Sequence, residues 1–322
     1  MPYKLFDTSR LQLKPLTERV HDVKISVNTE VEPLQEDIRD SEDILAVANA
    51  IKLAKKEKAT VLMMYGAHVI RTGNSPGMIR LMKEGYVTHF ATNGAGSIHD
   101  FELAMIGETC ESVARYISEG QFGLWKETGL LNEAVVIGDK EGLGFGEAVG
   151  KYIWENDFKF KEQSVLAMAY HFGIPATVHV GIGNDIVHEH PNFDPAATGR
   201  ATYRDFLIYA ESVLNLQNGV FLNFGSAVTG PEVYLKALAM ARNVAKQENK
   251  NINRLTTAVF DVLPLEGNTK KEPEKTNPQY YFRPWKTILA RTVANGGQSY
   301  YICGKHQQTI PALVNILLER EK

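Results

Sequence analysis

Residues 88–111 read THFATNGAGSIHDFELAMIGETCE, and this stretch decides the fold that we expect. Residues 86–91 predict a short buried strand, and apolar residues at helical spacing follow from Ile98. Between them, the small residues of 93–96 predict a turn that exposes backbone N–H groups at a helix N-terminus, where a phosphate can bind. The glycine spacing is not the G-x-G-x-x-G fingerprint, so an ordinary strand-to-helix turn is the alternative.

A second bend of the same kind, NFGSAVTGP, covers residues 223–231. It follows a strand expected over 219–224 and precedes a helix expected from about 232 to 246. Two such bends in one sheet can face the same crevice outside the carboxyl ends of the strands, where doubly wound folds bind nucleotides. The pair therefore predicts a dinucleotide site, and two unrelated packing turns are the alternative.

The rest of the chain alternates helices with buried strands, which predicts an α/β fold with a doubly wound, mostly parallel sheet of Rossmann-like type. The further strands are expected over 59–65, 176–180, 255–260 and 299–302, and the further helices over 41–58, 74–84, 111–118, 164–172, 203–216 and 307–318. We expect residues 1–40 to form an N-terminal arm. Residues 41–322 are then expected to form a single Rossmann-like domain that binds a dinucleotide, with a glycine-rich insertion near 120–160 and a loop over 264–284.

Composition excludes several classes of function. A net charge of −3 gives no reason to expect nucleic acid or an anionic membrane as a partner. No long apolar span or export signal is visible, so we expect a cytoplasmic protein. The two cysteines, Cys110 and Cys303, are far apart, so neither a disulfide framework nor a zinc knuckle is implied.

Residues 181–190, GIGNDIVHEH, carry one candidate for catalysis. His188 or His190 is a candidate general base, because histidine titrates near neutral pH. Asp185 can bind a ribose hydroxyl or an ammonium group, or it can be a structural turn acid. A metal-dependent hydrolase that uses His188, His190 and Asp185 stays as a rival hypothesis, and so does a polar loop without a role.

The segment 280–286, YYFRPWK, carries another candidate. It follows the long loop and could fold over the crevice as a lid. A lysine shielded from water beside an aromatic ring can act as a nucleophile and form a Schiff base, which predicts that role for Lys286. A buried tryptophan next to a solvated lysine is the alternative.

From about residue 60 onward the chain resembles the deoxyhypusine synthases and their divergent bacterial relatives. The resemblance is carried by the blocks at 92–100, 173–175, 184–185, 223–228, 257–260 and 285–288, in that order. It implies a Rossmann-like fold that binds NAD, in a homotetramer with sites at subunit contacts. It also implies a transferase: NAD oxidises spermidine, an enzyme lysine takes the aminobutyl group as an imine, and a protein lysine accepts it.

The chain departs from that family at Arg283, which stands where an acid would attract a polyamine. We therefore expect an NAD-dependent enzyme of the deoxyhypusine synthase type, or a related NAD-dependent step on another amine; a non-catalytic NAD sensor is a further rival. The predicted catalytic residues are Lys286, His188 and Asp185, and no metal is expected. The predicted cofactor contacts are Thr92, Asn93, Gly94, Ala95, Gly96, His99, Asp100, Gly225 and Ser226.

Overall fold

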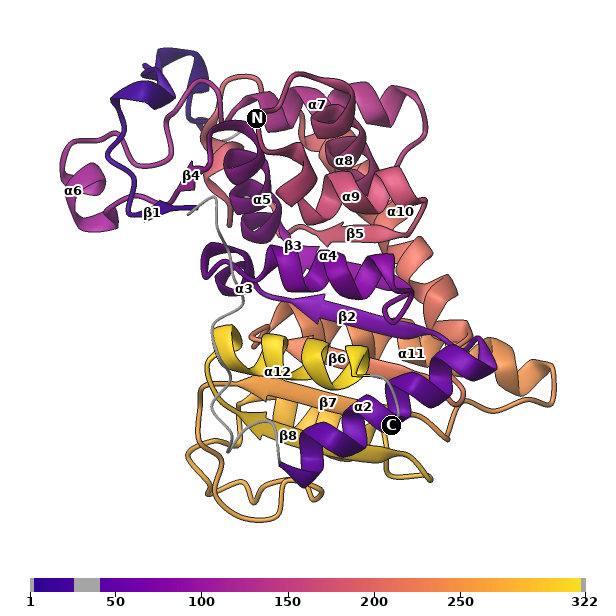
Figure 1. Cartoon of the computed structure of the whole chain (residues 1–322). Coiled ribbons are helices and arrows are strands. Elements are labelled where there is room, and N and C mark those ends of the chain that lie inside the picture. Colours follow the sequence, from indigo (N-terminus) through magenta and orange to yellow (C-terminus); the bar gives the residue numbers. More distant parts are fainter. Residues whose placement is uncertain (1–2, 26–40, 320–322) are drawn as a thin grey trace.

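A six-stranded parallel sheet forms the centre of the protein in a computed structural model, which describes residues 3–25 and 41–319 (Figure 1). Its strands lie in the order β5-β3-β2-β6-β7-β8. Numbered along the chain, this order is 3-2-1-4-5-6, the arrangement of dinucleotide-binding Rossmann domains. The strands are β2 (Val61–Tyr65), β3 (His89–Asn93), β5 (Ala176–His179), β6 (Val220–Phe224), β7 (Thr256–Asp261) and β8 (Gln298–Cys303). The expected doubly wound fold is confirmed.

Helices cover both faces of this sheet, so β2 is buried on both sides. Val61, Met63 and Tyr65 of β2 belong to one hydrophobic core, whereas Leu62 and Met64 belong to the other. The first core lies under α2 (Glu42–Glu57), α4 (Ser75–Lys83), α5 (Gly94–Ile106), α8 (Phe145–Glu155), α9 (Val165–Phe172) and α12 (His306–Leu318). The second lies under α10 (Pro195–Leu214), α11 (Thr229–Gln247) and the π-helical segment η5 (Trp285–Arg291).

Helix boundaries follow local chemistry. α2 begins with Glu42 and Asp43 and ends with Lys55 and Lys56, which suits the helix dipole and agrees with the predicted range. α10 begins at Pro195, eight residues before its predicted start, because the Asp194 carboxylate accepts the N–H groups of Ala196 and Ala197.

The region predicted as a glycine-rich insertion is helical. It holds α7 (Leu130–Lys140) and α8, which pack on each other and on α10. Gly146 and Gly150 lie in α8. A Cβ on Gly146 would come within 2.0 Å of the Ala176 carbonyl oxygen, and one on Gly150 within 2.3 Å of the Leu166 carbonyl oxygen. These glycines therefore permit close packing, and they do not mark loops.

The described part of the N-terminal arm packs against this body. Its strand β1 (Val23–Lys24) pairs with β4 (Glu108–Thr109), and Lys14 forms a bridge with Trp125 near α6 (Val113–Ser118). The rest of the expected arm, at 1–2 and 26–40, lies outside the described residues. Among the residues that are described, no helix is both long and apolar enough to cross a membrane.

Candidate functional site

The switch point of the sheet lies between β2 and β6, and their loops meet there. Gly66 follows β2 and donates its N–H to the Phe224 carbonyl oxygen at 2.9 Å. A Cβ on Gly66 would lie 2.5 Å from the carbonyl oxygen of Gly225, which itself has a φ of +58°. Sequence reasoning assigned no role to Gly66; its position directly after the first strand of a Rossmann sheet was the available signal.

Within the second bend, residues 226–229 present backbone N–H groups that donate to no acceptor in the described part of the chain. The N–H groups of Ser226, Ala227, Val228 and Thr229 have no acceptor within residues 3–25 and 41–319, whereas the Ser226 hydroxyl accepts the N–H of Gly230 at 2.8 Å. These groups stand at the N-terminus of α11, a helix of 19 residues. The bend therefore has the hydrogen-bond donors and the helix dipole that a phosphate requires.

The first bend, 93–96, is already capped. The Asn93 side chain accepts the N–H of Gly96 at 3.0 Å, and the Asp185 carboxylate faces the N–H of Ala95. A Cβ on Gly94 would come within 1.9 Å of Asp185 Oδ2, so glycine makes room here for the carboxylate. An internal anion thus occupies the place that a phosphate would take, and cofactor binding by this bend stays a prediction.

Asp185 and His188 form a unit at the start of η4 (Ile186–Glu189). His188 Nδ1 accepts the N–H groups of Gly183 and Asp185, both at 3.1 Å, and its Nε2 lies 3.9 Å from Asp185 Oδ2. With Nδ1 accepting, neutral His188 carries its proton on Nε2, so it presents an N–H to Asp185 and has no free lone pair in this conformation. Burial raises the pKa of Asp185 to about 6, against the effect of the Ala95 N–H. Burial lowers the pKa of His188, so it favours the neutral form of both side chains.

A cavity of about 300 Å³ opens beside these residues. Among its lining residues are three predicted ones, Ala95, His99 and Asp185. The others come from the arm, α3 (Ala67–Arg71), α5, the β4–α6 region and the 181–190 loop; they are Arg19, Arg71, Ile98, Glu102, Cys110, Glu111, Val113, Phe122, Asn184 and Ile186. Sequence reasoning missed Arg19, Arg71 and Glu102, because nothing local places them together.

His99 is held by a chain of hydrogen bonds that ends on Glu102. The Thr109 hydroxyl donates to Glu102 Oε2 at 2.7 Å, so its oxygen accepts from His99 Nδ1 at 2.8 Å. Nδ1 therefore carries the proton, and Nε2 keeps its lone pair. Burial lowers the pKa of His99 to about 4, which keeps the ring neutral at pH 7.

Two of the predicted cofactor contacts, Thr92 and Asp100, have hydrogen-bond partners within the chain. Thr92 is fully buried and donates to the Tyr65 carbonyl oxygen at 2.9 Å. Asp100 accepts the hydroxyl of Ser164 at 2.5 Å and the N–H of Val165 at 2.8 Å, so its carboxylate caps α9. Neither lines the cavity.

Lys286 is brought to the same edge of the sheet but to a different part of it. Only 4% exposed, it directs Nζ at the Tyr280 ring, 4.0 Å from the centroid. Lys286 lies at the start of η5, between β7 and β8, whereas Asp185 follows β5, and the sheet order puts β3, β2 and β6 between β5 and β7. Of the three predicted catalytic residues, Asp185 lines the cavity, whereas Lys286 and His188 do not.

His190 and a metal site were the rival assignment for the 181–190 loop. His190 is 2% exposed, and its Nε2 bonds to the Gly123 carbonyl oxygen at 2.8 Å. No group of three or more histidine, cysteine or acidic side chains is arranged to hold a metal ion in the part of the chain that the structure describes.

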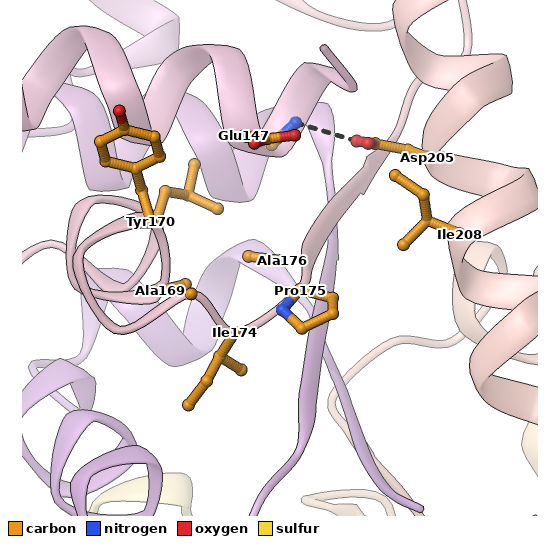
Figure 2. A pocket seen from close by; sticks show the side chains of 11 residues that line it. Glu147, Ala169, Tyr170, Ile174, Pro175, Ala176, Asp205 and Ile208 are labelled. Carbon is orange, nitrogen blue, oxygen red and sulfur yellow. Dashed lines mark hydrogen bonds between the residues drawn. The ribbon is translucent and has the colours of Figure 1, made fainter. Parts of the chain in front are cut away.

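A second cavity, of about 250 Å³, lies at the opposite edge of the sheet, where β5 begins at Ala176, directly after Pro175 (Figure 2). Figure 2 shows the Asp205 carboxylate directed at the start of α8, where Oδ2 accepts the N–H of Gly146 at 2.9 Å. Oδ2 also accepts the N–H of Val178 at 2.6 Å, and burial raises the pKa of Asp205 to about 8. This carboxylate joins α10 to α8 and β5, away from the bends, so we give it a structural role.

Comparisons with known proteins support the fold. No family model matches the sequence, and no curated protein is significantly similar to it. AgrE, solved as a ternary complex with ornithine and NAD+, superposes with a TM-score of 0.53 at 14% sequence identity. The superposition covers 88% of this chain and 34% of the AgrE chain. A conserved protein from Methanococcus maripaludis S2, assigned provisionally to the LOR/SDH type, gives a TM-score of 0.50 at 13% identity, over 92% and 72%.

An Entamoeba histolytica protein, assigned provisionally as a deoxyhypusine synthase, gives a TM-score of 0.43 at 11% identity, over 86% of this chain and 87% of its own. The chain spans about a third of the AgrE chain. At these identities the likeness concerns the fold alone, so the class defined here is a Rossmann-like α/β protein with a cavity at the carboxyl edge of its sheet.

Proposed function

We propose that this protein is an NAD-dependent enzyme that acts on an amine. The observation that carries the proposal is the second bend, where four N–H groups without an acceptor in the described part of the chain stand at the switch point of a 3-2-1-4-5-6 sheet. These residues fit a pyrophosphate, which needs several donors and a helix N-terminus. AgrE shares the fold and was solved with ornithine and NAD+, which supports naming both the cofactor and an amine.

The residues divide into two roles under this proposal. Gly225 and Ser226 belong to the bend that would hold the cofactor phosphates, and bound NAD would supply a hydride acceptor. Asp185 would hold the ammonium group of the substrate, because it is an acid that lines the cavity. His188 would orient Asp185, and the predicted cofactor contacts of the first bend, with Ala95 and His99 on the cavity wall, would border the same space.

The finer form of the proposal is transfer through Lys286, as in the deoxyhypusine synthases. Nζ would attack the carbon of an imine made by amine oxidation, and the original amine would leave with a proton. Its support is the burial of Lys286 against Tyr280, which shields the amine from water. Borohydride added during turnover should then add the mass of the aminoalkyl group to Lys286, and Lys286→Arg should abolish this label. If wild-type protein turns over an amine without any label, the transfer step is wrong and the oxidation stands alone.

The cofactor site is tested at Ala227, which is exposed in the second bend and has a free N–H. Ala227→Glu places a negative charge beside the proposed phosphate and should weaken NAD binding by about tenfold or more. Ala227→Gln has nearly the same size without the charge, so it should weaken binding much less. Isothermal titration with NAD measures both variants. Equal affinities for wild type and Ala227→Glu would contradict the proposed cofactor site.

A further inference from the structure

The geometry of the cavity points to an α-amino acid as its ligand: we propose that Arg71 binds the carboxylate and Asp185 the ammonium group. This rests on the proposed function, because it specifies the amine on which the enzyme acts. It adds a binding residue, Arg71, that belongs to none of the predicted contacts.

The first argument is the balance of charges on the cavity wall. Glu102 is neutralised by Arg19, which donates to its two oxygens at 2.8 and 2.7 Å. Glu111 accepts the Gly123 N–H at 2.9 Å and the Trp125 Nε1–H at 2.8 Å, one on each oxygen. Asp185 has backbone N–H groups and the Nε2 of His188, 3.9 Å from Oδ2, as neighbours, and no lysine or arginine among the described residues pairs with it. It is thus the acid available to an ammonium group.

Arg71 supplies the opposite charge. It ends α3, is exposed, and has no hydrogen bond or ion pair with any residue in 3–25 or 41–319. Its charge acts on His99 and Cys110, which line the same cavity. Arg71 and Asp185 therefore place a cation and an acid on the wall of one cavity. A ligand that satisfies both carries a carboxylate and an ammonium group, and the planar guanidinium suits a carboxylate.

His99 completes the arrangement as the proton acceptor. Thr109 and Glu102 hold its proton on Nδ1, so the lone pair of Nε2 is free, and no described residue occupies it. In the oxidation, the Cα–H bond breaks as a hydride passes to a nicotinamide dinucleotide, and a proton passes from the nitrogen to His99 Nε2. The product is the imino acid, so electrons and protons balance.

The test pairs L-α-amino acids with the amines left by their decarboxylation, for example L-ornithine with putrescine. Titration calorimetry of the full chain, with and without NAD, should show that wild type binds at least one amino acid about tenfold to a hundredfold more tightly than its amine, the effect of one charged hydrogen-bonded pair. Arg71→Ala should remove this preference. Arg80→Ala is the control, because Arg80 is an exposed helical arginine whose partner is Glu84. Asp185→Asn should weaken both members of the pair, and Asp157→Asn, at an exposed position, should weaken neither.

Three results would overturn the inference: no amino acid in the panel binding at millimolar concentration, equal affinity for acid and amine in wild type, or an unchanged preference in Arg71→Ala. His99→Asn keeps a donor near Thr109 but removes the free ring nitrogen. It should retain binding and lose turnover, and full turnover would reject His99 as the acceptor. Because calorimetry without NAD measures the cavity directly, a failure here is separate from a failure of NAD binding in Ala227→Glu.

Discussion

Replacing Arg19 with methionine should destabilise the protein by about 3–5 kcal/mol at pH 7, the cost of leaving a buried charge without its partner. Both side chains of the Arg19–Glu102 pair are nearly inaccessible, at 1% and 2% exposure, and the guanidinium donates two bonds to the carboxylate. Methionine keeps the length of the side chain but removes both donors. Glu102 would then retain only the hydroxyls of Thr128 and Thr109.

Urea unfolding followed by tryptophan fluorescence measures this loss, because the Arg19 guanidinium lies 5.9 Å from the centre of the buried Trp125 ring. Hydrogen exchange of β1 and β4 would show whether the arm opens before the body unfolds. The double variant Arg19→Met with Glu102→Gln removes both charges and should recover at least about half of the loss.

The pH dependence has a definite sign. Burial alone would raise the pKa of Glu102, but the bonds and charge of Arg19, with the two hydroxyls, bring it below its usual value of 4.5. The ionised pair therefore stabilises the fold above this value, and that contribution is lost as the pH falls. In Arg19→Met, burial raises the pKa of Glu102 without the opposing effect of Arg19, so Glu102 takes up a proton more readily. The stability that the variant has lost relative to wild type should therefore become smaller as the pH falls toward about 5. A loss below about 1 kcal/mol, as for exposed ion pairs, or no recovery in the double variant, would refute this reasoning.

Three further predictions concern the cavity and the sheet. Ala95→Trp should fill the cavity and remove amino-acid binding while unfolding stays cooperative; unchanged affinity by calorimetry would show that the ligand lies elsewhere. Because the pKa of Asp185 is raised to about 6, its carboxylate is largely protonated at about pH 5. The affinity for an amine should therefore rise with pH through about 6 and then level off. Asp185→Asn should lack this rise, and the same pH profile in the variant as in wild type would reject the assignment. Burial raises the pKa of Asp205 from 3.8 to about 8, so its contribution to stability is present below about pH 4 and is lost as the pH rises toward 8. The side chain of Asp205→Asn cannot ionise, so the unfolding free energy of wild type, measured with urea, should fall relative to that of the variant between about pH 5 and pH 9. If wild type instead gains stability relative to the variant, the N–H groups that Asp205 accepts outweigh its burial.

The strands were predictable because each is a run of apolar residues between turn residues, but their ends were not. The strand expected over 86–91 is β3, His89–Asn93. Thr92, beyond the predicted end, is fully buried in the strand, where its hydroxyl donates to the Tyr65 carbonyl oxygen. That partner lies 27 residues away in the sequence, so no local pattern shows that a buried polar residue will be satisfied.

The candidate site was predictable only in part. Asp185 was predicted from its residue type and His99 from the resemblance of residues 92–100 to the family, and both line the cavity. Their roles were not predictable, because the tautomer of His99 depends on Thr109 and Glu102, and the accessibility of the first bend depends on a carboxylate about 90 residues further along the chain.

The amino-acid sequence by itself determined the alternation of helix and strand, and with it the parallel sheet and the edge at which both bends end. These properties follow from local apolar periodicity and from the one-handed crossover of parallel strands. Only the tertiary structure decided which bend has N–H groups without an acceptor among the described residues, that Arg71 lines the cavity beside Asp185, and that Lys286 does not line it. Those outcomes depend on strand order and on contacts between distant segments, and these are set when the whole core packs.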